Sequence, residues 1–285
     1  MTDLLEYLSS PFVLRALIGV FLIAINAALS GVFASFRSLT FLVSGASHAA
    51  LAGAALIIVL EAYGLVHLGN PVLGGAVFAV ALALLAGGAS FRSSDRAADP
   101  AIGVGFAFSM ALAVLLISLI PESATRVWGV LIGDLLLLSN QDLLILGSLT
   151  GLVVLLFGVL RREFLFITFD MEGARAFGIQ AGVYNYILFA LIGLSAAILM
   201  KGVGAIVVFA MLVSPGAAAL LIGSTVNAVV AWAFGIAFAS GLIGIVLSYY
   251  IDFSVSALAA IISAASYFIA KGVIWVQSRG KKAEG

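Results

Sequence analysis

Long apolar segments recur along the whole chain and constrain its fold more than any other feature. Many of them approach the ~20 residues that a helix needs to cross a ~30 Å hydrocarbon layer. Of the 285 residues, 64% are hydrophobic and 9% are charged, whereas about a quarter of a soluble domain is charged. Helices satisfy the main-chain polar groups of such segments internally. The sequence therefore predicts an all-α, polytopic membrane helix bundle, with a single transmembrane domain over residues 1–285.

About nine spans are expected from the spacing of the polar breaks. Their approximate limits are residues 12–35, 39–62, 71–89, 101–120, 142–160, 184–200, 203–221, 226–250 and 254–276. Residues 1–11 are expected to form a short amphipathic lead-in at the interface. A cleavable signal peptide is not expected there, because the segment contains Asp3 and Glu6 rather than a basic start. Residues 127–138 are too short to cross, so they are expected to form a half-helix or re-entrant segment around Asp134. A helix N-cap is expected in the turn at residues 139–142.

Lysine and arginine gather at alternate ends of these spans. One set of ends holds Arg37, Arg92, Arg96, Arg161, Arg162, Arg175, Arg279, Lys281 and Lys282, and the other holds Arg15, Arg126 and Lys201. Cytoplasmic loops carry the excess of positive charge. We therefore expect the N-terminus outside and the C-terminus in the cytoplasm.

Several classes of activity lack support in the sequence. A formal net charge of zero gives no indication of nucleic-acid binding, and the absence of cysteine excludes disulfides and thiolate metal sites. The sequence contains no P-loop, no HExxH and no evident Ser-His-Asp set. We expect a transport protein rather than an enzyme, with no ATP hydrolysis by this chain itself and no permanently bound cofactor.

The segment from Arg37 to Gly53 contains the most informative polar side chain. His48 lies about 16 Å beyond Arg37 at ~1.5 Å per residue, which places it near mid-membrane. An ionisable side chain at that depth is a candidate for a translocation pathway, as Asp134 is. Ser44 lies one turn before His48, and Ser47 is adjacent. A neutral imidazole binds divalent transition metals, but one histidine is not a site, so other helices or a second copy would have to supply ligands.

Two elements on the predicted cytoplasmic side suggest a docking surface. Asp170 and Glu172 precede a short Ala/Gly-rich helix that ends near Gly178, and acids are favourable at its N-terminus. The second element begins at Pro215, where proline in the first turn and the small residues after it predict a short helix along the membrane surface.

The chain resembles the permease subunits of the ABC importers for zinc, manganese and iron(II). The resemblance covers nearly the whole chain and rests on six motifs in order: V-S-G-A-S-H-A (43–49), D-P-A-I-G-V-G-F (99–106), G-D-L-L-L-L-S-N-Q-D-L (133–143), F-D-M-E-G-A-R-A-F-G-I (169–179), V-G-A-I-V-V-F-A-M-L-V-S-P-G-A-A-A (203–219) and L-S-Y-Y-I-D (247–252).

The resemblance implies a fold related to the siderophore and cobalamin importer permeases. It also implies a homodimeric or pseudo-dimeric pore in a prokaryotic inner membrane, two cytoplasmic ATPase subunits and an extracytoplasmic metal-binding protein. The transported ion would pass His48, Ser44, Ser47, Asp134 and Asp252. ATPase coupling is expected at Pro215, Gly216, Ala217 and Ala218, supported by Asp170, Glu172 and Gly178.

The sequence departs from the family pattern at two places. Ser44 stands where the family has an aspartate one turn before the histidine, and Ser254-Val255-Ser256 replaces P-x-G after Asp252. Two alternatives stay open at this point: a permease for a metal chelate or another small solute, and a secondary transporter that works alone.

Overall fold

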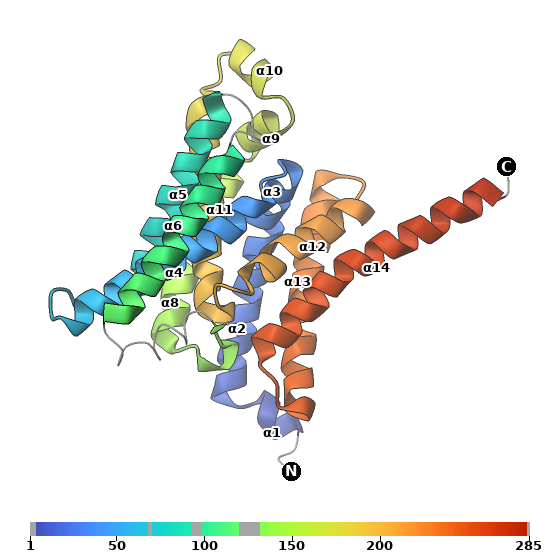
Figure 1. Cartoon of the computed structure of the whole chain (residues 1–285). Coiled ribbons are helices and arrows are strands. Elements are labelled where there is room, and N and C mark those ends of the chain that lie inside the picture. The colour runs from blue at the N-terminus through green and yellow to red at the C-terminus, as the bar shows by residue number, and fades with distance from the viewer. Residues whose placement is uncertain (1–3, 68–69, 93–97, 120–131, 284–285) are drawn as a thin grey trace.

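The described chain is built from helices and short connections. The computed structural model describes residues 4–67, 70–92, 98–119 and 132–283 (Figure 1). The helices are α1 (Leu4–Leu8), α2 (Pro11–Asn26), the π-helix η1 (Ala27–Gly31), α3 (Val32–Phe36), α4 (Thr40–Ala62), α5 (Val72–Arg92), α6 (Ala98–Leu119), the 3-10 helix η4 (Leu135–Leu137), α8 (Asn140–Val159), α9 (Arg161–Phe169), α10 (Met171–Ala176), α11 (Ala181–Val203), α12 (Val208–Ile222), α13 (Val226–Ile251) and α14 (Val255–Ala283).

Eight helical segments in the described part of the chain are long and apolar enough to cross a membrane. They agree with eight of the nine expected spans, and α2, η1 and α3 together form the first of them. The expected span at 203–221 is wrong in its extent. Gly204, with a φ of 84°, caps the end of α11, and helix resumes only at Val208. The resulting 15-residue helix α12 is ~22 Å long, less than the ~30 Å layer.

The expectation of a surface helix beginning at Pro215 is also wrong. Pro215 lies inside α12, which begins seven residues earlier at Val208. Both Pro215 and Gly216 are buried, because α12 packs against η1, α13 and α14. A Cβ atom on Gly216 would lie 2.9 Å from the main-chain oxygen of Gly31 in η1. This close backbone contact explains the small residue, and neighbouring helices make an interior proline tolerable in a membrane protein.

The helix ends gather at two opposite ends of the bundle (Figure 1). One end holds α1, η4 and the turn between α13 and α14, and the other holds α3, α9 and α10. At the α1 end, Ser139 caps α8 and exchanges hydrogen bonds with Asp142, as the N-cap prediction requires. Residues 127–131 of the predicted half-helix at 127–138 lie outside the described residues, as do Arg96 and Arg126; the described part, from residue 132, contains the short η4.

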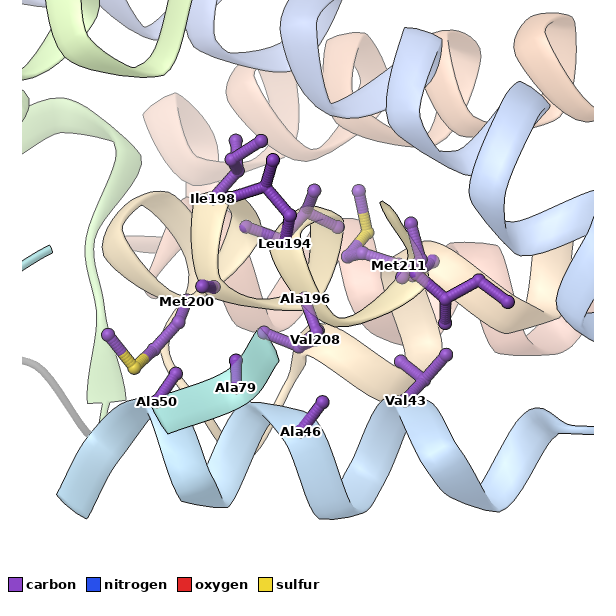
Figure 2. Close-up of a cluster of buried hydrophobic side chains, with 14 of the residues drawn as sticks. Val43, Ala46, Ala50, Ala79, Leu194, Ala196, Ile198, Met200, Val208 and Met211 are labelled. Atoms are coloured by element: carbon purple, nitrogen blue, oxygen red, sulfur yellow. The ribbon is translucent and has the colours of Figure 1, made fainter. Parts of the chain in front are cut away.

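The core lies where α4, α5, α11 and α12 meet. Figure 2 shows Val43, Ala46 and Ala50 of α4 facing Met200 of α11 and Met211 of α12, and all five are buried. The other spans are less covered, and α14 and α6 are the least buried of the eight. Figure 1 shows α14 extending away from the body of the bundle.

Candidate functional site

A partly open polar stripe runs along the first half of α4. Thr40, Ser44 and His48 are half-buried and follow one another at intervals of four residues. Such spacing places the three side chains on one face of a helix. That face lies on the opposite side of α4 from Ala46 and Ala50, which pack into the core. His48 is therefore the deepest polar side chain of an open strip on an otherwise buried span.

The hydrogen bonding of His48 fixes its tautomer. Its Nδ1 atom lies 2.9 Å from the main-chain oxygen of Ser44. A carbonyl oxygen only accepts, so Nδ1 carries the proton and Nε2 keeps its lone pair. The hydroxyl of Ser47 donates to the same Ser44 oxygen over 2.9 Å. An imidazole held in this way presents Nε2 as the atom for a metal ion, and an oriented second nitrogen is the usual arrangement of metal-binding histidines.

Aromatic rings border the stripe. The ring of Phe106 on α6 meets the His48 imidazole edge-on, with centroids 4.6 Å apart, and Phe41 lies 6.2 Å from Phe106. Phe106 belongs to the motif 99–106, but its contact with His48 could not be read from the sequence. The rings restrict how His48 can turn, so its position is set by two helices rather than by α4 alone.

The described residues of one chain do not complete a metal site. Within them, no group of three or more His, Asp and Glu side chains is close enough to hold an ion. The further ligands that His48 would need to hold a metal ion are therefore not grouped around it in the described part of the chain.

The two predicted pathway acids lie at the α1 end of the bundle, whereas His48 lies near the middle of α4 (Figure 1). Asp134 caps η4, accepting a hydrogen bond from the Leu136 amide at 2.9 Å. Burial raises the pKa of Tyr7 in α1, and the nearby charge of Asp134 raises it further, against a hydrogen bond with Ser248 that lowers it. Asp252 ends α13 in a left-handed conformation and is exposed. The structure does not bring either acid to His48.

The predicted helix near residues 169–178 is present as α10. Asp170 caps it by accepting a hydrogen bond from the Gly173 amide at 2.7 Å, and Glu172 lies in its first turn. Arg175 fastens α10 to α5, since it donates to the Phe91 main-chain oxygen at 3.0 Å and its guanidinium lies 4.3 Å from the Phe91 ring centroid. Gly178 follows with a φ of 78°. This element stands at the end of the bundle, and residues 175–178 are exposed.

The other predicted coupling residues lack such exposure. Ala218 is fully buried and Ala217 is half-buried, while Pro215 and Gly216 are buried as described above. The exposed part of this region begins beyond them, at Leu221 and Ile222.

Two buried polar networks went unnoticed in the sequence. In the first, Asn26 donates to Thr150 over 3.0 Å and accepts from Ser195 over 2.8 Å, and Ser30 lies 2.7 Å from Ser195. In the second, Arg37 donates to Asn185 over 2.6 Å. A single asparagine inside each of two apolar spans could have indicated these networks. Polar side chains in a membrane helix form hydrogen bonds with other helices.

Known proteins resemble this chain over nearly its whole length. The model of the ABC 3 transport family matches residues 9–274. The manganese import system permease protein ScaB of Streptococcus parasanguinis is 28% identical over 272 residues, covering 95% of this chain and 94% of that protein. A probable iron transport system membrane protein of Haemophilus influenzae is 29% identical over 94% of this chain and 95% of its own length.

Two solved structures share the fold of this chain. PsaBC from Streptococcus pneumoniae, solved in complex with Fab, matches with a TM-score of 0.80 and 25% identity over 93% of both chains. An inward-facing metal-chelate type ABC transporter, described as putative, shares the fold with a TM-score of 0.68 and 20% identity, over 90% of this chain and 84% of its own. With the family model covering all but the two ends, the chain belongs to the ABC 3 transport family.

Proposed function

We propose that this chain is the membrane-spanning permease subunit of an ABC importer, and that its cargo is a divalent transition-metal ion of the manganese, iron or zinc group. The observation that carries the proposal is the His48 stripe. It presents a metal-binding nitrogen, with its tautomer fixed, at mid-depth on an open face. Relatives named as manganese and iron permeases support this choice of cargo.

A second copy of the chain is the proposed source of the missing ligands. The ring of Phe106 on α6 borders His48, and α6 is among the least buried spans. A homodimer that covers α6 would turn the open stripe into the wall of a central route and would bring a second imidazole toward the first. Ser44 would offer only a weak hydroxyl ligand, so the ion would be held loosely, as transit requires.

The proposed docking site for the partner ATPase is α9 with α10, rather than residues 215–218. Phe177 at the end of α10 is 80% exposed, and Phe169 before it is also exposed. Two exposed aromatic side chains around a capped helix offer the apolar anchors typical of a protein interface. The connection of Arg175 with Phe91 would transmit movement of α10 to α5, which packs against α4.

The proposed orientation follows from the charges. Arg37, Arg161, Arg162 and Arg175 belong to the bundle end that carries α10, so this end is cytoplasmic under the positive-inside rule. The α1 end, with η4 and Asp252, then faces the extracytoplasmic metal-binding protein.

Metal transport by the reconstituted complex tests the proposal. The permease, with its ATPase and binding protein, is placed in proteoliposomes, and uptake of radiolabelled manganese is measured. His48→Ala should lower uptake at least ten-fold with complex assembly intact. The matched control is His67→Ala, because His67 is the other histidine of the chain and is exposed in the loop after α4. Wild-type uptake by an assembled His48→Ala complex would overturn the role of His48.

A further inference from the structure

A deep apolar groove lies away from the His48 stripe, between α8 and α13. Its volume is about 680 Å³. Ile25 at the end of α2, Ala28 and Leu29 of the π-helix η1, and Phe33 of α3 also line it. Val154 and Phe157 line one wall, and the other wall is made of apolar residues of α13. Both walls belong to candidate membrane spans, so the groove lies at the level of the hydrocarbon layer.

The groove has its polar groups at one end. Arg161, at the start of α9, and Asn227, in the first turn of α13, both line it, and the guanidinium donates a hydrogen bond to the Asn227 side-chain oxygen. A guanidinium carries five N–H donors and is suited to phosphate oxygens. Among the described residues Asn227 is its hydrogen-bond partner. The side chain of Arg161 is exposed, so its donors can reach an acceptor above the groove.

The length of the groove fits one leaflet. From Val226 to Phe234, both lining residues of α13, eight residues rise ~12 Å. One leaflet contributes half of a ~30 Å hydrocarbon layer. An acyl chain lying in the groove would therefore extend over most of its leaflet, with its headgroup level with Arg161.

From this arrangement we infer that the groove is a binding site for one anionic phospholipid of the leaflet at the Arg161 end, with an acyl chain between α8 and α13 and the phosphate on Arg161. Charge complementarity favours this occupant, since basic pockets between membrane helices on the cytoplasmic side bind anionic headgroups. The lipid would brace η1, whose Gly31 lies against the main chain of Leu212 in α12. Lipid binding in the groove would not depend on which cargo the permease carries.

Lipid retention by the purified full-length chain tests the inference. The delipidated protein is titrated with phosphatidylglycerol or phosphatidylcholine in detergent, and bound lipid is counted by native mass spectrometry. We expect tighter binding of phosphatidylglycerol, and Arg161→Gln should weaken it about five-fold, the effect of about one basic contact. Arg162→Gln is the matched control, because Arg162 is a neighbouring exposed arginine outside the groove lining.

A second pair of variants tests the acyl chain. Gly158 lines the groove, and a Cβ atom there meets no atom within 4 Å, so Gly158→Phe should fill the groove without disturbing the described packing. It should abolish the preferred lipid adduct. Gly147→Phe is the control on the same helix, since Gly147 is equally open but lies outside the groove lining.

Four results would overturn the assignment of the groove to a lipid. The first is equal retention of both lipids by the wild type, and the second is wild-type retention by both Arg161→Gln and Gly158→Phe. The third is displacement by inorganic phosphate at the same concentration, which would mark a site for a free anion. A shift from dimer to monomer in Gly158→Phe with unchanged lipid binding would instead assign the groove to a second copy.

Discussion

The guanidinium of Arg37 donates a 2.6 Å hydrogen bond to the side-chain oxygen of Asn185. Arg37 ends the first span, and Asn185 lies in the first turns of α11, 148 residues later. The same guanidinium lies 3.4 Å from the Ser90 hydroxyl and over the ring of Phe189, and the Asn185 amide donates to the Gly87 oxygen. Arg37 is only 6% exposed. One asparagine therefore joins α3, α5 and α11.

Asn185→Leu should destabilise the permease by about 1–3 kcal/mol, because it removes an acceptor from a buried guanidinium and a donor from Gly87. Thermal unfolding in detergent measures the effect. Asn185→Asp keeps an acceptor for Arg37 and should unfold closer to the wild type. Equal midpoints for Asn185→Leu and the wild type would show that the network contributes little.

Gly216→Glu should abolish accumulation of folded permease. The new side chain would meet the Gly31 backbone and bury a carboxylate between η1 and α12. The yield of monodisperse protein on size exclusion measures this. The pair Gly216→Leu and Gly151→Leu isolates the steric effect: Gly151 lies on the exposed side of α8, where a Cβ atom meets no atom within 4 Å, so only Gly216→Leu should lower the yield. A well-folded Gly216→Glu protein would contradict the packing described here.

Phe177→Asp should lower ATPase binding and cargo-stimulated hydrolysis several-fold while leaving the thermal midpoint unchanged. Its ring is 80% exposed and its centroid lies 6.0 Å from that of Phe166 in α9, so it contributes little to the packing of the core. Phe253→Asp is the control, because Phe253 is similarly exposed in the turn between α13 and α14, at the opposite end. Equal binding of the ATPase by both variants would count against docking at α10.

Ser44→Asp should increase retention of manganese in the assembled transporter at least ten-fold and slow its release. A carboxylate one turn from His48 adds a hard, charged ligand to the neutral imidazole. Equilibrium dialysis against manganese, with Thr40→Asp as the control one turn further away, measures this. Unchanged retention in Ser44→Asp would place Ser44 away from the ion.

Single-cysteine labelling tests the orientation of the chain in the membrane. The chain has no native cysteine, so only the introduced residue can react. Glu172→Cys should resist a membrane-impermeant maleimide in intact cells, whereas Tyr63→Cys should react, because both positions are exposed at opposite ends of the bundle. Labelling only at position 172 would reverse the topology proposed from the lysine and arginine distribution.

The sequence by itself determined the helical class, the limits of eight spans, the cap at Ser139, helix α10 and the candidate at His48. These features depend on local information: the length of an apolar run, a turn residue at a helix start, and one ionisable side chain at a calculable depth. Each can be read along the chain without knowing which helices touch.

Only the tertiary structure decided which faces meet. In a membrane helix the lipid-facing and core-facing sides are both apolar, so hydrophobic periodicity does not separate them. For this reason Pro215 looked like the start of a surface helix, although packing buries it within α12. Likewise, only the structure showed that Asp134 caps η4 at the α1 end, at a different level of the bundle from His48. The partnership of Arg37 with Asn185 and the groove beside Arg161 also arise from contacts between helices distant in sequence.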